Sequence, residues 1–240
     1  MGSEMCIRDR SQVVSLENDL ASRPIERLAD GIAFDPTIVY TQGMLANAYF
    51  FGHPIWAHKY LQRKSKDPFW KKRWQHVTPS LDNKIVVDIG CGPGNVYADM
   101  GGKPKIIIGV DISWDGLKIA KQVGYTPLLA DAHNLPLKSQ SADIVTVNAT
   151  LHHCDDMAAV LKEAARLVKP RGWLITDLDP QCSAWNFKGL GLWIHQIRRS
   201  FPLHRLGELS LYRSATEINM RLATETHNAT PGDGLSLIHI

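Results

Sequence analysis

The sequence is short of cysteine and of long apolar runs, and each shortage excludes a class of protein. Four of the 240 residues are cysteine and none forms a C-x-x-C pair, so we expect free thiols in a reducing compartment. His152, His153 and Cys154 lack a visible fourth ligand for zinc, so no metal is expected. No apolar run reaches the roughly 20 residues that span a bilayer, and no secretory signal pattern opens the chain, which predicts a cytoplasmic protein.

Net charge is also small. A value of +3 does not by itself indicate a nucleic-acid partner. One segment departs from this balance, because Lys59–Arg73 holds seven basic residues and one acid, and Trp56, Phe69, Trp70 and Trp74 lie in or beside it. This pattern is typical either of an RNA-binding surface or of a solvated helix whose tryptophans pack inward.

The sequence does contain a strand followed directly by a glycine-rich turn. Residues 86–95 are Val-Val-Asp-Ile-Gly-Cys-Gly-Pro-Gly-Asn. The β-branched run Ile85–Ile89 is typical of a buried strand, and it places Asp88 at the carboxyl end, where open α/β sheets bind ligands. Glycines let a ligand approach the backbone closely. The G-x-G-x-G spacing differs from the dinucleotide motif G-x-G-x-x-G, which argues against a nicotinamide-dependent oxidoreductase.

Three further strand-like runs each end in a polar residue. The runs and the residues that follow them are Ile106–Val110 with Asp111, Thr126–Ala130 with Asp131, and Ile144–Val147 with Asn148. Asp111 lies 21 residues after Gly90, and an acid about 20 residues past a glycine loop is placed to bind a ribose. The carboxyl ends of parallel strands share one edge of a sheet, so these residues predict a single ligand crevice.

These segments resemble the class I S-adenosylmethionine (SAM)-dependent methyltransferases, in the branch that acts mostly on small molecules and lipids. The matching segments, in the family's order, are Val86–Asn95, Gly109–Ser113, Leu129–Pro136, Asp143–Asp156 and Ala164–Asp177. The resemblance implies a doubly wound, Rossmann-like parallel α/β sheet of order 3-2-1-4-5. It also implies SAM as cofactor and methyl transfer to a small-molecule or lipid-like acceptor by in-line displacement, and it leaves the acceptor open.

The resemblance further implies a set of cofactor-binding residues. They are Asp88, Gly90, Cys91, Gly92, Gly94, Asp111, Ile112, Asp131, Ala132 and Asn148. In this family pattern Asp88 acts near the cofactor's amino group, through water or the loop backbone. Asp111 accepts hydrogen bonds from both ribose hydroxyls, and Asp131 accepts from the adenine amine. Ile112 packs on the adenine, and the Ala132 N–H donates to a ring nitrogen.

Catalytic groups are harder to assign, because the cofactor carries its own electrophile and the protein mainly positions the reactants. In the family pattern Asn148 lines the methionine end of the cofactor. His152 and His153 follow, where the family places groups that face the substrate. Either imidazole can deprotonate an acceptor near neutral pH, or the pair can serve pocket shape alone. The Asn/Asp-Pro-Pro-aromatic box of nucleic-acid amino-methyltransferases is replaced by Asn-Ala-Thr-Leu at 148–151, which argues against base amines as acceptors.

The spacing of apolar residues and the positions of glycine and proline also predict the helices and strands around these segments. Residues 11–36 are expected to be a loose polar lead-in, and Trp173–Leu178 a fifth strand. Helices are expected within 37–62 as two pieces separated near Gly52 and Pro54, and at 67–76, 94–101, 114–123 and 156–168.

The chain is expected to have four parts. Residues 1–10 resemble a translated sequencing-adapter fragment, 11–80 form a helical N-terminal extension or lid, and 81–228 form the SAM-binding domain. Residues 229–240 are expected to be a truncated end with an artefactual tail, so that the family's C-terminal hairpin strands are missing.

Two other functions stay open at this stage. One is an RNA-modifying or RNA-binding protein of the same fold that uses Lys59–Arg73, and the other is a SAM-binding module without transfer activity. Peripheral membrane contact through the apolar and basic stretch after Asp179 is a further alternative. The sequence does not indicate an oligomeric state.

Overall fold

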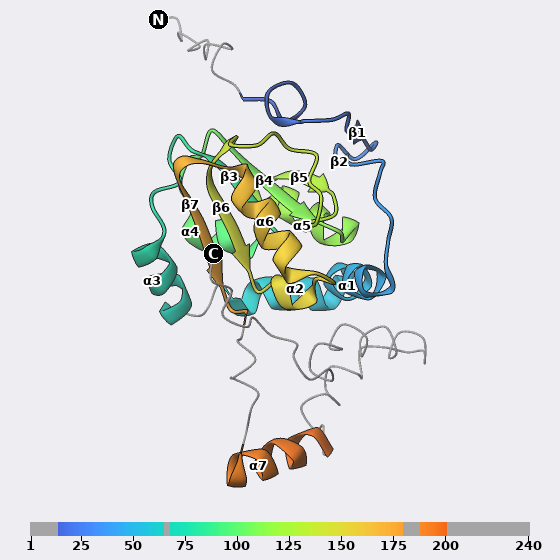
Figure 1. The fold of residues 1–240 in the computed structure, drawn as a ribbon, viewed down its shortest axis with the longest axis vertical. Coiled ribbons are helices and arrows are strands. Elements are labelled where there is room, and N and C mark those ends of the chain that lie inside the picture. Colours follow the sequence, from blue (N-terminus) through green and yellow to red (C-terminus); the bar gives the residue numbers. More distant parts are fainter. Residues whose placement is uncertain (1–13, 65–67, 180–187, 201–240) are drawn as a thin grey trace, which may run out of the picture.

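The computed structural model describes residues 14–64, 68–179 and 188–200, and its centre is a seven-stranded sheet (Figure 1). The strands are β1 (Glu26–Arg27), β2 (Ala33–Phe34), β3 (Ile85–Ile89), β4 (Ile106–Asp111), β5 (Thr126–Leu129), β6 (Ala142–Asn148) and β7 (Val168–Asp177). Their order is β1-β2-β5-β4-β3-β6-β7, and every neighbouring pair except β1 and β2 is parallel. The predicted α/β class and the order 3-2-1-4-5 of the five main strands are confirmed.

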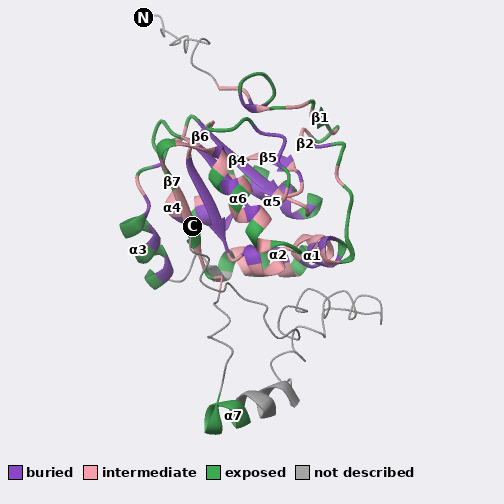
Figure 2. Cartoon of the chain, viewed as in Figure 1, coloured by how far each residue is buried: buried purple, intermediate pink, exposed green. Residues whose placement is uncertain are grey.

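The central strands β3, β4 and β6 are buried, which explains their runs of valine and isoleucine (Figure 2). Alternate residues of each strand serve opposite faces of the sheet. Val87 and Ile89 share a core cluster with helix α6 (Met157–Leu167). Val86, one residue before Val87 and so on the opposite face, shares a second cluster with helix α5 (Trp114–Val123). The strands are thus covered by helices on both faces.

The strands β3, β4 and β6 are followed by helices, two of which, α5 and α6, begin at side-chain caps. These helices are α4 (Asn95–Met100), α5 and α6, close to the predicted bounds. The Ser113 side chain accepts a hydrogen bond from the Gly116 N–H at the start of α5, and Asp156 accepts one from the Ala159 N–H at the start of α6.

The N-terminal extension contributes three helices, as predicted. They are α1 (Gln42–Gly52), α2 (Pro54–Lys64) and α3 (Pro68–Val77). Pro54 is the first residue of α2 and Pro68 the first residue of α3. At this position a backbone N–H has no partner within the helix, so its absence in proline costs no hydrogen bond. α1 and α2 lie along one end of the sheet, and α3 lies beside β7 (Figure 1).

The prediction of a loose lead-in over residues 11–36 is wrong for its described part. Leu16 and Leu20, in a single helical turn, are 2% and 4% exposed and belong to the main core cluster. The hairpin of β1 and β2 then extends the sheet, because β2 pairs in parallel with β5 through Ala33 and Leu128. Strands of two residues are too short to carry an alternating pattern, so periodicity could not reveal them.

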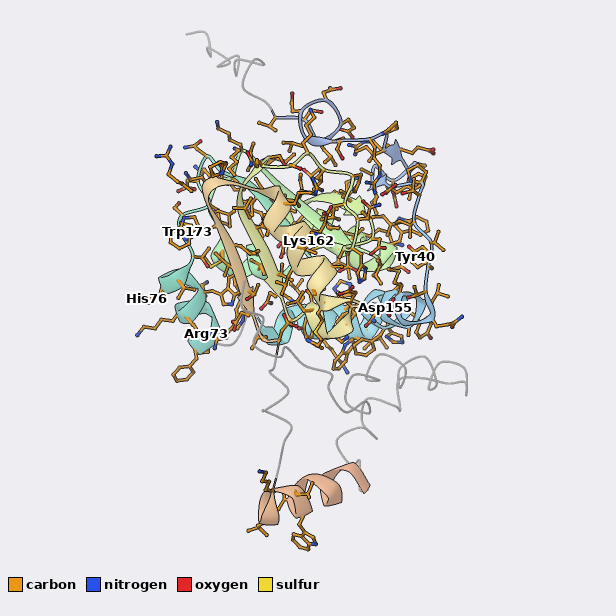
Figure 3. The ribbon with its side chains drawn as sticks, in the orientation of Figure 1. Tyr40, Arg73, His76, Asp155, Lys162 and Trp173 are labelled. Atoms are coloured by element: carbon orange, nitrogen blue, oxygen red, sulfur yellow. The ribbon has the colours of Figure 1, made fainter. Side chains whose placement is uncertain are left out.

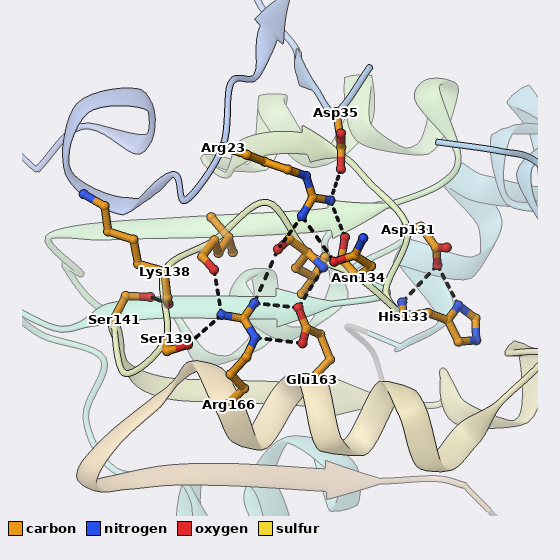
Figure 4. A network of polar contacts seen from close by, with 12 residues as sticks. Arg23, Asp35, Asp131, His133, Asn134, Lys138, Ser139, Ser141, Glu163 and Arg166 are labelled. Atoms are coloured by element: carbon orange, nitrogen blue, oxygen red, sulfur yellow. Dashed lines mark hydrogen bonds and ion pairs between the residues drawn. The ribbon is translucent and has the colours of Figure 1, made fainter. Parts of the chain in front are cut away.

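A polar network holds this N-terminal segment against the loop that follows β5 (Figure 4). Arg23 donates to the carbonyl oxygen of Asn134 at 2.6 Å and pairs with the buried Asp35. Burial would raise the pKa of Asp35, but hydrogen bonds from Arg23 and Thr37 outweigh it and the pKa is lowered. On α6, Arg166 donates to the carbonyl oxygen of Leu137, at 2.8 Å, from the other side of the same loop.

The last strand differs from the prediction in where it begins. β7 begins at Val168, directly after α6, rather than at Trp173. Ala142 pairs with Val168 and Ile144 pairs with Trp173, so the intervening residues of β7 bulge out of the ladder. Arg171, within this bulge, has a φ of 64°. Pro170 does end the helical pattern, but the chain re-enters the sheet at once.

Several predictions concern residues outside the described ones. They include the artefactual segment 1–10, the truncated end 229–240 and the missing hairpin strands. Helix α7 (Gly189–Ser200) is described, and its Leu190, Trp193 and Ile194 are exposed. Within the described residues, no helix combines the length and the apolar character needed to cross a membrane.

Candidate functional site

A cavity lies at the carboxyl ends of β3, β4, β5 and β6, and helix α1 forms one of its walls. Its empty volume is about 850 Å³ with the open space at its mouth included. This edge of an open parallel sheet is where ligands bind. The lining residues are Met44, Asn47, Phe51, Tyr60, Gly90, Cys91, Gly92, Asn95, Val96, Val110, Asp111, Ile112, Ala130, Asp131, Ala132, His133, Asn148, Ala149, Thr150, His153, Cys154 and Asp155.

The glycine-rich loop after β3 owes its shape to positive φ angles. φ is 69° at Gly90, 52° at Gly92 and 98° at Gly94, values that favour glycine. The N–H groups of Gly90 and Cys91 donate to the carbonyl oxygen of Val110 at 2.8 and 3.0 Å. A Cβ on Gly92 would meet no atom within 4 Å, so the backbone there faces open space. Gly94 is the N-cap of α4 and lies outside the lining.

Asp111 ends β4 in the cavity wall and also fastens the glycine loop. Its Oδ2 accepts from the Gly92 N–H and its Oδ1 from the Ser113 N–H, both at 2.8 Å. Burial raises the pKa of Asp111, and these backbone hydrogen bonds oppose that shift in part. Each oxygen keeps a second lone pair, so the carboxylate can still accept hydrogen bonds from a diol in the cavity. Ile112 lines the cavity beside it.

Asp131 follows β5, and its carboxylate binds His133, two residues further on. Its Oδ1 accepts from the N–H and from Nδ1 of His133, at 2.9 and 2.6 Å. Nε2 of His133 accepts from the Asp156 N–H at 3.1 Å, so the neutral ring carries its hydrogen on Nδ1. Burial would raise the pKa of Asp131, but the hydrogen bonds from His133 outweigh it and lower the pKa. Both residues, and Ala132 between them, line the cavity.

Asp88 lies beneath the loop and outside the cavity lining. It is 1% exposed, and its carboxylate accepts from the Thr146 hydroxyl and from the Tyr125 hydroxyl, each at 2.7 Å. The Tyr125 hydroxyl in turn accepts from the Tyr97 N–H at 2.9 Å. Any influence of Asp88 on a ligand therefore passes through this network and the loop, not through a direct contact.

The burial of Asp88 predicts a specific pH dependence of stability. Burial raises its pKa from 3.8 to about 6, although hydrogen bonds from Thr146 and Tyr125 act in the opposite direction. The folded protein thus holds this proton more tightly than the unfolded chain. The contribution of Asp88 to the free energy of unfolding is full below its unfolded pKa and is lost as the pH rises through its folded pKa.

Urea unfolding of the parent and of Asp88→Asn between pH 4 and pH 7 measures this effect. At about 1.4 kcal/mol per pKa unit, we expect the parent to lose about 2–3 kcal/mol relative to the variant over that interval. The readout is the difference between the two proteins in how the free energy of unfolding changes with pH. A loss of stability that is the same at every pH in the variant does not affect this difference. Parallel pH profiles of the two proteins would show that Asp88 is not held neutral by its burial.

The two predicted catalytic histidines occupy different positions. His153 lines the cavity, and its ring lies edge-on to Phe51 with centroids 5.3 Å apart. His152 lies outside the lining, and its Nδ1 is 2.6 Å from Oδ1 of Asp179, whose side chain is 3% exposed. The two imidazole centroids are 4.0 Å apart, so the His152 ring packs against the His153 ring and limits its movement.

Several lining residues were missed by sequence reasoning. Met44, Asn47 and Phe51 come from α1, and Tyr60 from α2. Positions 44, 47 and 51 follow the helical spacing of three and four, so the sequence did indicate a common face. It did not indicate that this face meets the sheet's ligand edge. Asn95 and Thr150 also line the cavity, and both lie next to predicted motifs.

The polar lining is rich in hydrogen-bond acceptors. Asn47, Asn95 and Asn148 are 6%, 6% and 9% exposed, and each Oδ1 is buried with no hydrogen-bond partner in the described part of the chain. The carboxylates of Asp111 and Asp131 add negative charge. No lysine or arginine is found among the described residues that line the cavity. Such a cavity fits a ligand that is cationic and rich in hydrogen-bond donors.

The basic and aromatic segment provides little exposed aromatic surface. Trp70 and Trp74 on α3 are 4% and 1% exposed and pack with Val96. Trp74 also donates its indole N–H to Asp177 at 2.8 Å, and Arg73, labelled in Figure 3, pairs with the same carboxylate. Phe69 is exposed, but buried tryptophans cannot stack on nucleic-acid bases. The arrangement favours the alternative in which the tryptophans are structural.

Comparison with known families agrees with this geometry. Residues 87–176, which include most of β3, all of β4 to β6 and nearly all of β7, match the model described as "Methyltransferase domain". This segment is similar to a methyltransferase domain. It contains the glycine loop, Asp111, Asp131 and His153, so all the cavity residues outside α1 and α2 belong to it.

Several named methyltransferases are similar to this part of the chain. A ubiquinone biosynthesis O-methyltransferase of Thiobacillus denitrificans is 34% identical over 42% of this chain and 47% of its own length. A malonyl-[acyl-carrier protein] O-methyltransferase of Hamiltonella defensa is 31% identical over 50% of this chain and 47% of its own. A solved SAM-dependent methyltransferase of Thermotoga maritima aligns with a TM-score of 0.49 and 21% identity, covering 73% of this chain and 79% of its own. The chain spans about half the length of the curated relatives it matches.

Proposed function

We propose that this protein transfers a methyl group from SAM to a small-molecule acceptor. The observation that carries the proposal is the position of Asp111, which ends β4 in the cavity and is hydrogen-bonded to the glycine loop of a methyltransferase domain. The relatives named above methylate small molecules or a carrier-bound malonyl group, which supports the same class of reaction here.

The residues present fit SAM as the cofactor. SAM carries a sulfonium, an ammonium and a carboxylate group, so its net charge is positive, and it offers donors from its ribose hydroxyls and its adenine amine. Asp111 would accept from the hydroxyls and Asp131 from the amine, while the open backbone at Gly92 leaves room against the loop. The unpartnered oxygens of Asn95 and Asn148 suit the cationic end. When bound, SAM supplies a methyl carbon that is already activated for displacement.

The protein's own part is then to position the acceptor and to take its proton. His153 is the imidazole in the cavity wall, and its ring is held between Phe51 and His152. We assign it the role of general base, since an imidazole near neutral pH can accept the proton of a hydroxyl or amine. The α1 wall shields the reacting groups from water.

Binding and transfer must be measured separately, because a SAM-binding module would give only the first. Calorimetry of the purified chain with S-adenosylhomocysteine is expected to give a micromolar dissociation constant. Incubation with [methyl-¹⁴C]SAM and a small-molecule extract is expected to yield labelled product that chromatographs as a small molecule. Binding without any labelled product would indicate a module, and a folded protein that binds no S-adenosylhomocysteine would contradict the methyltransferase proposal.

A further inference from the structure

One face of α1 lines the cavity, and its side chains differ in chemistry from the glycine loop. Met44, Asn47 and Phe51 project from the same side of α1 into the cavity. The start of α1 is tied to the loop after β6, because the Thr41 hydroxyl donates to Asp155 Oδ2 at 2.8 Å. Asp155, labelled in Figure 3, lies beside this helix. This face is fixed next to His153, where an acceptor has to lie.

Asn47 is the polar group of that face. Its Nδ2 donates to the carbonyl oxygen of Gly43 at 2.9 Å and to that of His153 at 3.4 Å, which fixes the opposite end of the amide as the oxygen. The residue is 6% exposed, and its Oδ1 has no hydrogen-bond partner in the described part of the chain. An unpaired buried carbonyl is costly, so a ligand that donates a hydrogen bond to it is favoured.

The surroundings of Asn47 are mostly apolar and aromatic. The Phe51 ring lies 6.1 Å from the Tyr60 ring at 74°, and it also contacts His153 edge-on. Met44, one turn before Asn47, adds a flexible apolar side chain. The edges and faces of these aromatic rings favour a planar ring as the ligand. A planar ring gains more binding energy from aromatic contacts than a flexible chain does.

The charge of the cavity lining further restricts the class of acceptor. Asp155 and Asp111 border the cavity, and the described lining holds no lysine or arginine to pair with an anion. A carboxylate or phosphate on the acceptor would therefore be repelled and poorly solvated. An uncharged acceptor meets neither penalty.

Building on the proposed function, we infer that the acceptor is a ring-bearing molecule without negative charge that donates a hydrogen bond to Oδ1 of Asn47. Phe51, Tyr60 and Met44 hold the ring, and the hydrogen bond orients it beside His153. Asn47 is thus a specificity-determining residue on α1, outside the methyltransferase domain that binds the cofactor.

Three probes of similar size test the inference on the protein saturated with S-adenosylhomocysteine. Phenol has the ring and the donor, anisole has the ring without the donor, and benzoate has the ring with a negative charge. Ligand-observed NMR titrations are expected to show phenol binding about five- to tenfold tighter than anisole, the worth of one buried hydrogen bond. Benzoate is expected to bind more weakly than phenol.

The ratio of phenol to anisole affinity within each variant is the decisive readout, because it cancels general effects on folding. Asn47→Ala is expected to bring this ratio close to one, whereas Asn18→Ala, the same change at an exposed position, leaves it unchanged. Equal binding of phenol and anisole by the parent, an unaltered ratio in Asn47→Ala, or benzoate as the tightest probe would each overturn the inference. Failure of the parent to bind S-adenosylhomocysteine would instead contradict the proposed function.

Discussion

Replacing Asp111 by alanine is expected to lower the affinity for S-adenosylhomocysteine at least about a hundredfold, roughly 2.7 kcal/mol. The variant removes two acceptors proposed for the ribose hydroxyls, and hydrogen bonds to a charged group contribute about 1.5–3 kcal/mol each. It also releases the N–H of Gly92, which Asp111 Oδ2 holds at 2.8 Å, so the glycine loop loses its anchor. Isothermal titration calorimetry at pH 7.5 measures the change directly.

Tyr40→Phe is the matched control for this experiment. It removes a hydroxyl that donates to the carbonyl oxygen of Ile112 at 3.1 Å, close to Asp111 but without touching its carboxylate. Loss of one partly exposed hydrogen bond amounts to about 1 kcal/mol or less, so the affinity should fall by no more than about fivefold. A folded Asp111→Ala protein that binds as well as Tyr40→Phe would show that Asp111 does not hold the cofactor.

Gly90→Ala is expected to lower the free energy of unfolding by about 2–4 kcal/mol. The new Cβ would lie 2.2 Å from Oγ1 and 2.3 Å from Cγ2 of Thr150, and the φ of 69° is itself unfavourable for alanine. Thr150 cannot easily retreat, because its hydroxyl donates to the carbonyl oxygens of Asn148 and Ile89 at 3.0 and 3.2 Å. Urea denaturation followed by circular dichroism gives the value.

Gly92→Ala separates backbone strain from steric clash in the same loop. Its φ is 52°, but an added Cβ meets no atom within 4 Å, so only a conformational cost of about 1–2 kcal/mol is expected. The methyl group would occupy cavity space beside the proposed cofactor, so this variant should lose affinity for S-adenosylhomocysteine while remaining folded. Equal losses of stability in the two variants would contradict the assigned role of Thr150.

The parallel sheet and half of the cavity could be predicted because their signals are local. Runs of valine and isoleucine that end in Asp111, Asp131 or Asn148 place polar groups at one edge, whatever the details of packing. Asp88 was placed in the correct strand, but its role depends on Thr146 and Tyr125, which meet it only through the fold. A strand pattern does not tell whether a carboxylate at its end points into a crevice or into the sheet.

The rest of the site depends on contacts between distant segments. His152 and His153 are adjacent in sequence, and what separates their environments is the hydrogen bond between His152 and Asp179, 27 residues further on. The α1 face carrying Asn47 is similarly positioned by Asp155, 114 residues from Thr41. The local sequence pattern shows which residues share one face of such an element. It does not show which distant segment that face contacts.

The N-terminal segment has a consequence for how this protein can be divided. Leu16, Leu20 and Ala33 lie in the same core cluster as β3 to β6, and Arg23 fastens this segment to the loop after β5. A fragment that begins at residue 81, the start of the expected cofactor domain, would leave that core open to water and the outer side of β5 unpaired. The smallest piece suited to crystallisation or to isotope labelling for NMR therefore has to begin ahead of Leu16, even though the family match begins only at residue 87.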